Sequence, residues 1–239
     1  MGKKYIHDEI AHNLNAPKVI VPLILQYVQP QCVVDFGCGT GTWLHVFKNY
    51  GVQEVLGLDG SWYNKELLFK HITEQEFRCV DLETHVHLDK KYDLVVSLEV
   101  AEHISEKNAD TFVQSLVLAG KIILFSAAFP GQGGFNHINE QWPSYWAKKF
   151  EQFDYHFHDV IRGKIWNNRD VDMWYKQNIF FVVHDSVGFN HPDDLLSVHN
   201  PVIHPDFFNK LAMIRDGERG VSLYFRLFLK SLYFKLTHK

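Results

Sequence analysis

The stretch Val33-Val34-Asp35-Phe36-Gly37-Cys38-Gly39-Thr40-Gly41 decides the fold. It predicts a buried strand over 32–35 that ends in an acid and a glycine-rich turn, with a helix over 43–50 beyond it. The three glycines let the backbone turn tightly and let a ligand approach main-chain atoms closely. A turn of this kind is typical of a nucleotide-like ligand site at the carboxyl end of the first strand of an open α/β sheet. The residues match neither a phosphate-binding P-loop nor the G-x-G-x-x-G dinucleotide fingerprint.

The rest of the chain alternates apolar strand patterns with helix patterns. Strands are expected over 54–60, 77–82, 92–99 and 121–126, with helices over 17–28, 62–72 and 109–118. This alternation predicts a doubly wound, Rossmann-like α/β fold, with a mostly parallel sheet and helices on both faces. A helix over 143–153 and two further strands, over 161–166 and 179–183, would complete a seven-stranded sheet. A long loop over 184–204 and a helical segment over 206–239 follow.

We therefore divide the chain into three parts. Residues 1–16 form an N-terminal arm, residues 17–183 form the domain, and residues 184–239 form a loop and a C-terminal helical extension. Within the domain, residues 129–178 are expected to be an insertion that caps the acceptor side, because the strand–helix alternation ends there. The glycine-rich segment 130–134 inside it predicts a loop.

The composition of the chain indicates which kinds of binding partner and which cellular compartment to expect. The 239 residues carry a formal net charge of -4, which argues against a general nucleic-acid-binding protein. Three cysteines are an odd number without framework spacing, so reduced thiols and a cytoplasmic location are expected. The apolar run over 19–25 is short and contains Pro22, so neither a signal peptide nor a membrane-spanning helix is expected.

Three predicted strands carry an acid at or near their ends, and the positions of these acids indicate which kind of ligand the site binds. Asp35 precedes the first glycine, where it can order the turn or accept from an ammonium group. Asp59 ends the second strand, where an acid typically accepts hydrogen bonds from ribose hydroxyls. Asp81 lies in the third predicted strand, near its end, where it could reach a base edge. The turn contains no basic residue to neutralise a pyrophosphate, so an adenosine-bearing ligand without a phosphate fits best.

Four segments in order, 34–41, 57–60, 80–82 and 97–103, resemble the successive motifs of class I S-adenosylmethionine-dependent methyltransferases. The resemblance covers residues 17–183. It implies that Gly37, Cys38 and Gly39 line the methionine part of the cofactor, that Asp59 holds the ribose, and that Asp81 and Leu82 hold the adenine. The complete implied cofactor set is Asp35, Gly37, Cys38, Gly39, Thr40, Trp43, Asp59, Gly60, Asp81, Leu82, Leu98 and Glu99.

Four later segments, 125–134, 136–142, 145–146 and 172–178, resemble a bacterial methyltransferase group often found with surface-glycan (capsule polysaccharide and lipopolysaccharide) biosynthesis. By this analogy the enzyme is an O-methyltransferase. Its acceptor would be a small sugar, nucleotide-sugar or glycan intermediate, and not a nucleic acid. Two alternatives stay open: an N- or carboxyl-methyltransferase of another small metabolite, or a catalytically silent, cofactor-binding partner in a glycan-assembly complex.

The segment Glu99-x-x-Glu102-His103 follows the fourth strand and is expected to face the active-site cleft. Two carboxylates and an imidazole this close together can bind a divalent ion, and His137 would be the natural fourth ligand. A similar segment in ubiquinone-pathway O-methyltransferases and small-RNA 2′-O-methyltransferases resembles a metal site. In metal-free relatives, Glu99 instead helps to position the cofactor and Glu102 caps the next helix. We favour the metal-free arrangement.

In the metal-free arrangement, His103 or His137 is the general base, and Glu102 completes the predicted catalytic set. A neutral imidazole can take the proton of an acceptor hydroxyl near pH 7. The sulfonium group of the cofactor is already a strong methyl donor, so much of the catalysis can be positioning.

The C-terminal helix combines apolar residues with cations. Arg219, Arg226 and Lys230 share one face, and aliphatic and aromatic side chains surround much of the rest. The apolar side chains of such a helix are normally buried against another surface. We favour packing on the core or contact with a second copy of the chain, as in a homodimer. Peripheral attachment to an anionic membrane surface is the alternative.

Overall fold

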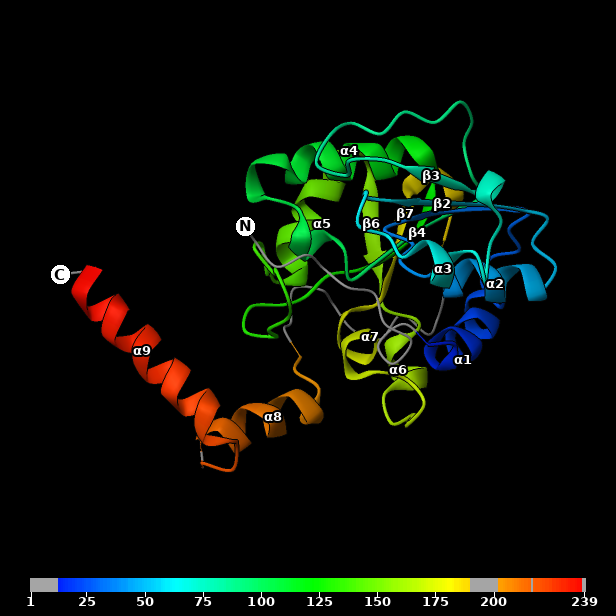
Figure 1. Cartoon of the computed structure of the whole chain (residues 1–239). Coiled ribbons are helices and arrows are strands. Elements are labelled where there is room, and N and C mark those ends of the chain that lie inside the picture. Colours follow the sequence, from blue (N-terminus) through cyan, green and yellow to red (C-terminus); the bar gives the residue numbers. More distant parts are fainter. Residues whose placement is uncertain (1–12, 190–201, 216, 238–239) are drawn as a thin grey trace. The chain divides into compact units, whose positions relative to one another are not determined.

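A computed structural model describes residues 13–189, 202–215 and 217–237 (Figure 1). Its centre is a seven-stranded sheet in the order β3-β2-β1-β4-β5-β7-β6. The strands are β1 (Cys32–Phe36), β2 (Glu54–Asp59), β3 (Phe77–Cys79), β4 (Leu94–Leu98), β5 (Ile122–Ser126), β6 (Tyr155–His158) and β7 (Phe180–His184). The first five are parallel, and β7 runs antiparallel to both β5 and β6. The predicted mostly parallel, seven-stranded, Rossmann-like fold is confirmed.

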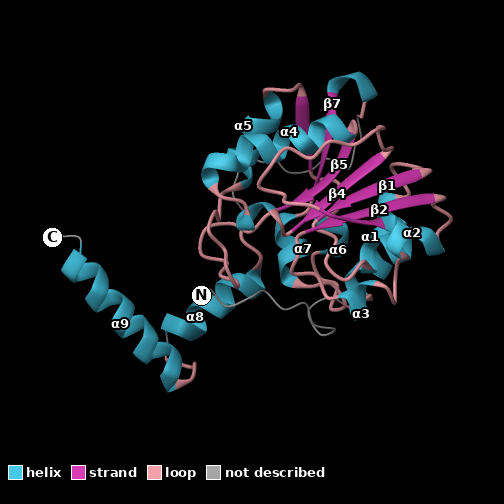
Figure 2. Ribbon diagram, turned by 45° about the horizontal axis from the view of Figure 1, so that its top comes forward, coloured by secondary structure: helices cyan, strands magenta, loops and turns pink. Residues whose placement is uncertain are grey.

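Alternation along the strands produces two cores, because successive side chains of a strand point to opposite faces of the sheet. Val33 lies in the core beneath α1 (Asn15–Ile24) and α2 (Thr42–Asn49), whereas its neighbour Val34 lies in the core beneath α4 (Ala109–Ala119) and α5 (Pro143–Glu151). Figure 2 shows the helices on both sides of the sheet. Both faces of the central strands are therefore covered, which explains why β4 is apolar nearly throughout.

Most element boundaries agree with the sequence to within a few residues. Helix α1 starts at Asn15, inside the predicted arm, and ends at Ile24, two residues after Pro22. Residues 1–12 of the arm lie outside the described residues, as do residues 190–201 of the predicted loop. Helix α3 is limited to Lys65–Leu68, and β3 ends at Cys79, so Asp81 and Leu82 lie in the turn beyond it.

The strand predicted over 161–166 is wrong. This segment contains the short helix α6 (Arg162–Ile165), and the sheet is completed by β6 instead. Ile161 and Ile165 are both fully buried at a spacing of four residues, which suits a helical turn. Arg162 pairs with Asp159, three residues earlier, which supports the same turn. The edge strand β6 is fixed by Tyr155, whose hydroxyl donates to the carbonyl oxygens of Val117 and Gly120.

Residues 203–239 form a second unit, which contains helices α8 (Pro205–Arg215) and α9 (Val221–Thr237). The predicted C-terminal helical extension is thus present. No described helix is both long enough and apolar enough to span a lipid bilayer.

The need for glycine at position 37, in the turn after β1, can be tested directly. Gly37 has a φ of +86°, and a Cβ added to it would lie 2.3 Å from Cγ2 of Val100. Gly51 has a similar φ of +93°, but nothing lies within 4 Å of its added Cβ. We expect Gly51→Ala to lower the free energy of unfolding by about 1–2 kcal/mol through backbone strain alone. Gly37→Ala should cost about 1–3 kcal/mol more, because it adds a clash.

Urea unfolding followed by circular dichroism checks this pair. Equal losses in the two variants would mean that Val100 moves aside and that contact between the turn and the end of β4 is not tight.

Candidate active site

The glycine-rich turn lies at the carboxyl edge of the sheet and is anchored on β2. The amides of Gly37 and Cys38 donate to the carbonyl oxygen of Leu58 at 2.7 and 3.1 Å. Gly37, Gly39 and Gly41 all have φ in the left-handed region, at +86°, +55° and +75°. The sequence pattern and the backbone therefore agree that this turn is built for close approach of a ligand.

Asp59, at the end of β2, closes the turn. Its Oδ2 accepts from the amide of Gly39 at 2.7 Å, and its Oδ1 accepts from the amide of Gly60 at 2.6 Å. Burial raises the pKa of Asp59 to about 6, although these hydrogen bonds oppose the shift. Burial and the neighbouring Asp59 also raise the pKa of Asp35 well above its ordinary value. Two buried acids thus lie beneath the turn.

The other predicted cofactor residues lie around this turn. Cys38, Thr40, Trp43, Leu82 and Leu98 are buried, and Asp81 is exposed, with its Oδ1 accepting from the amide of Glu83. Sequence reasoning missed Trp62. Its ring covers Gly60, where an added Cβ would come within 2.3 Å of it, and 43% of the residue is exposed. An aromatic residue two positions after the glycine that follows β2 was the available signal.

Glu99 follows β4 in an unusual conformation, with a φ of +56°. Its Oε2 accepts from Nε2 of Gln132 at 2.7 Å, and its Oε1 accepts from Nδ2 of Asn178 at 3.0 Å. Asn178 ends helix α7 (Met173–Asn178) and also donates to Oε1 of Gln132 at 2.8 Å. Burial raises the pKa of Glu99, partly offset by these bonds. Glu99 therefore belongs to an amide network that joins β4, the glycine-rich loop and α7.

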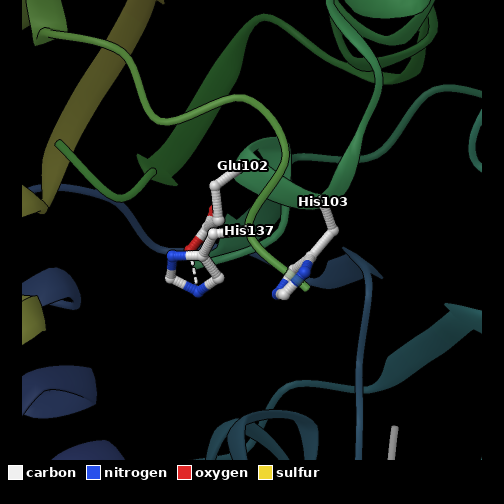
Figure 3. Close-up of side chains that lie close together, drawn as sticks. All are labelled: Glu102, His103 and His137. Carbon is white, nitrogen blue, oxygen red and sulfur yellow. Dashed lines mark ion pairs between the residues drawn. The ribbon is translucent and has the colours of Figure 1, made fainter. Parts of the chain in front are cut away.

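Glu102, His103 and His137 come together beside this network (Figure 3). One ligating atom from each lies within 4.8 Å of the others. His137 Nε2 lies 3.9 Å from Glu102 Oε1, and the two imidazole rings meet edge to face with centroids 5.0 Å apart. Glu102 is fully buried, and neither of its oxygens has a hydrogen-bond partner within the described part of the chain. Burial raises its pKa well above the ordinary value, and the nearby Glu99 adds to the shift.

Of the four residues named for a metal, the structure thus brings three into one cluster and engages Glu99 with amides. His103 Nδ1 lies 3.2 Å from the carbonyl oxygen of Asn136, and burial lowers the pKa of His103. The segment that follows is tied to the same place, because the amides of Ile138 and Asn139 both donate to the carbonyl oxygen of Glu102 at 3.0 Å. His137 is therefore presented to the cluster by a fixed backbone.

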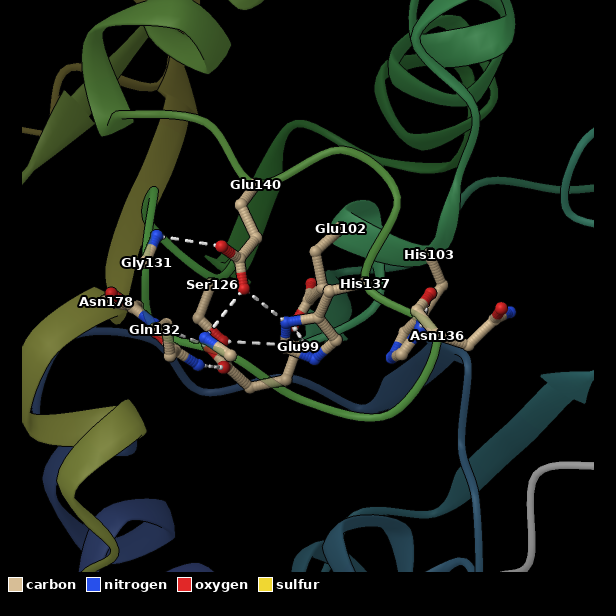
Figure 4. Close-up of polar contacts among 11 residues, drawn as sticks. Glu99, Glu102, His103, Ser126, Gly131, Gln132, Asn136, His137, Glu140 and Asn178 are labelled. Carbon is tan, nitrogen blue, oxygen red and sulfur yellow. Dashed lines mark hydrogen bonds and ion pairs between the residues drawn. The ribbon is translucent and has the colours of Figure 1, made fainter. Parts of the chain in front are cut away.

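Glu140 is a further residue that the sequence did not single out (Figure 4). Its Oε1 lies 2.9 Å from His137 Nδ1. The amides of Gly131 and Gly133 donate to its two oxygens at 2.8 Å each. Partial burial opposes ionisation, but these three partners hold the pKa of Glu140 below its ordinary value. The spacing of three residues from His137 was the only signal in the sequence.

The aromatic side chains near the candidate site divide into two groups. Trp146 is almost fully buried against Phe125 and belongs to the core. Trp142 stacks on Phe129 with ring centroids 5.7 Å apart, and Tyr175 meets Trp43 edge to face at 5.3 Å. Only the second group lies near the ends of the strands that carry the candidate site.

Comparison with known protein families shows to which family the chain belongs. A family model described as a methyltransferase domain matches residues 8–178. The chain belongs to the methyltransferase domain family. S-adenosylmethionine is accordingly its cofactor, as the sequence motifs implied. The matched residues include every strand of the sheet except β7.

Individual relatives are distant. A ubiquinone biosynthesis O-methyltransferase of Bartonella quintana is 24% identical over 125 residues, which are 51% of this chain and 49% of that protein. The chain thus matches about half the length of this curated relative. A solved small RNA methyltransferase is 18% identical with a TM-score of 0.54, over 77% of this chain and 26% of that one. The methyltransferase domain of a bacterial Hen1 protein is 16% identical with a TM-score of 0.52, over 72% and 99%. The structural likenesses show the shared fold.

The role of Asp59 can be tested directly on cofactor binding. In Asp59→Asn, one carboxylate oxygen becomes an NH2 group that faces a backbone amide, so one of the two turn contacts is lost. We expect the affinity for S-adenosylmethionine to fall roughly 10- to 100-fold, since a charge-assisted hydrogen bond contributes about 1.5–3 kcal/mol. Isothermal titration calorimetry measures this, with Asp89→Asn as a control at an exposed position outside the predicted cofactor set.

The same experiment has a pH arm. Because the pKa of Asp59 is raised to about 6, lowering the pH from 7.5 to 5.5 should protonate the carboxyl group and weaken cofactor binding in the wild type. Affinity that is independent of pH over this range, in both the wild type and Asp59→Asn, would contradict this role for the carboxylate.

Proposed function

We propose that this chain is an S-adenosylmethionine-dependent O-methyltransferase that acts on a hydroxyl group of a small, sugar-containing acceptor. One observation carries the choice of oxygen: two imidazoles and a buried carboxylate gather beside the end of β4, at the sheet edge that carries the cofactor turn. The name of the Bartonella quintana relative, an O-methyltransferase, supports the same choice. The sugar acceptor rests on the resemblance of residues 125–142 and 172–178 to surface-glycan methyltransferases.

Methyl transfer to a hydroxyl group needs a proton acceptor and an in-line approach. Burial lowers the pKa of His103, so its ring is neutral near pH 7 and can accept a proton. His137 points its Nε2 toward the same cluster. Either imidazole can therefore take the hydroxyl proton while the turn holds the methyl donor.

The cluster also fits a divalent ion. A fully buried carboxylate with no hydrogen bond to either oxygen is costly unless a cation or a proton compensates it. Carboxylate and imidazole ligands suit manganese or zinc. We therefore propose, beyond the metal-free arrangement that the sequence favoured, that Glu102, His103 and His137 hold a divalent ion. When bound there, the ion would lower the pKa of an acceptor hydroxyl.

Variants of the cluster separate the two arrangements. Glu102→Gln and His137→Ala should each reduce turnover about 10²- to 10⁴-fold, the range for removal of an acid–base group. Binding of S-adenosylmethionine should stay within about threefold of wild type, because neither residue contacts the Asp59 turn. Production of S-adenosylhomocysteine from a panel of nucleotide-activated sugars, glycan intermediates and short RNAs measures turnover. Calorimetry with manganese and with zinc measures ion binding without an acceptor.

The outcomes are distinct. Loss of ion binding in both variants supports the metal site, whereas unchanged activity after chelation supports the imidazole base. A preference for RNA would overturn the sugar acceptor, and methylation of an amine or a carboxylate would overturn O-methylation. Failure of the wild type to bind S-adenosylmethionine would overturn the proposed function, whereas binding without turnover of any acceptor would indicate a catalytically silent, cofactor-binding partner.

We also propose that α9 attaches to an anionic membrane surface. Six of its exposed apolar residues recur at helical spacing on one face, namely Val221, Phe225, Phe228, Leu229, Leu232 and Leu236, while Leu227, Tyr233 and Phe234 are exposed on its other sides. Arg226, Lys230 and Lys235 are its charged residues, and no acid lies between Val221 and Thr237. An apolar stripe flanked only by cations complements anionic headgroups better than it complements a second copy of itself, since two such helices repel.

Vesicle binding by the full chain tests α9. Binding should require an anionic lipid such as phosphatidylglycerol, since phosphatidylcholine alone offers no net charge. Arg226→Glu combined with Lys230→Glu should weaken it roughly tenfold or more, at about 1 kcal/mol for each basic residue. Phe208→Ser, on α8, is a matched control, because Phe208 is as exposed as Phe225. A stable dimer in light scattering without vesicle binding would instead assign α9 to a contact between copies.

A further inference from the structure

Glu140 accepts three hydrogen bonds from two sides of the candidate site. On one side its Oε1 lies 2.9 Å from His137 Nδ1. On the other, its Oε2 accepts from the amide of Gly131 and its Oε1 from the amide of Gly133, at 2.8 Å each. Backbone amides donate to both of its oxygens, which is the arrangement of an ionised carboxylate, and such a group can only accept. All three partners must therefore donate.

This requirement fixes the tautomer of His137. Since Nδ1 donates to a carboxylate, the proton of the neutral ring sits on Nδ1, and the lone pair sits on Nε2. Nε2 faces Glu102 Oε1 at 3.9 Å. Only 12% of the His137 side chain is exposed, so the ring has little room to turn. The nitrogen that faces the cluster is thus the one that can accept a proton or bind an ion.

The same carboxylate shapes the glycine-rich loop. Gly131 and Gly133 have φ of +88° and +69°, and nothing lies within 4 Å of a Cβ added to either. These glycines therefore serve backbone conformation rather than space, and they direct two amides to one carboxylate. Gln132 lies between them and donates to Glu99 Oε2 at 2.7 Å. Through the loop, Glu140 also positions the amide that holds Glu99.

We propose that Glu140 is a positioning residue that sets His137 in the Nδ1–H tautomer and couples it to the loop that holds Glu99. Its effect on catalysis rests on the proposed function, whereas its effect on the tautomer does not. Glu140 is placed to act through His137 and Gln132.

Nitrogen-15 NMR of histidine-labelled protein tests the tautomer without cofactor or acceptor, at a pH where the ring is neutral. Wild-type His137, assigned by comparison with His137→Ala, should carry its proton on Nδ1. In Glu140→Ala the Nε2–H tautomer should appear. Glu140→Gln, which leaves one acceptor oxygen for three donors, should give a mixture and is the second variant if Glu140→Ala does not fold.

Glu76→Ala is the matched control. Glu76 is similarly half-buried, also accepts from a backbone amide, that of Thr73, and pairs with Lys48 away from the site. It should leave the His137 tautomer unchanged even if stability falls. An Nε2–H tautomer in the wild type, or an Nδ1–H tautomer retained in both Glu140 variants, would overturn the proposal.

A kinetic arm then separates this inference from the proposed function. With an active acceptor, Glu140→Ala should lower kcat about 10- to 100-fold while affinity for S-adenosylmethionine stays within about threefold, in the range for loss of a group that orients a ligating or catalytic imidazole. If no acceptor is methylated by the wild type but the tautomer shifts, the proposed function fails and the positioning role of Glu140 stands. If the tautomer does not shift in an active enzyme, the reverse holds.

Discussion

The structure depends on a carboxylate that ends β2 and closes the turn that follows β1. Asp59 accepts from the amides of Gly39 and Gly60, so one side chain fixes the backbone on two sides of the cofactor site. The parallel pairing of β1 with β2 brings Asp59 to the turn, since Phe36 pairs with Leu58 one residue earlier. Burial raises its pKa to about 6, which shows that the fold tolerates an unfavourable charge to hold this geometry.

The acceptor side is organised by the antiparallel end of the sheet. Strand β7 pairs with β5, and helix α7 immediately precedes it, so Asn178 arrives beside the end of β4. There it meets Glu99, whose left-handed φ turns its carboxylate toward Asn178 and Gln132. Strain of this kind persists only where surrounding contacts determine it. Two amides thus engage the carboxylate of Glu99 beside the cluster of Glu102, His103 and His137.

The sequence predicted the fold well because the information was local. Each of the features used was local: strand-end acids, glycines in the turn and apolar runs predict the structure of the segment in which they occur. The error at 161–166 has the same origin: this short segment contains one helical turn, and periodicity does not separate a turn from a strand over so few residues. The candidate site was harder to predict from the sequence. Glu140, Gln132 and Asn178 matter through contacts between segments, and no spacing in the chain predicts that Gln132 and Asn178 share Glu99.

The buried carboxylate of Glu102 links these observations. A side chain at this depth, with no hydrogen bond to either oxygen in the described structure, is either neutral or paired with a cation. A neutral carboxyl group would present an O–H donor, and His137 Nε2, at 3.9 Å from Oε1, is too far away for a direct hydrogen bond. A partner between Glu102 and His137 would satisfy either state. The tautomer that Glu140 imposes places a lone pair on the nitrogen facing that space, so the geometry suits a bound ion or the oxygen of an acceptor there.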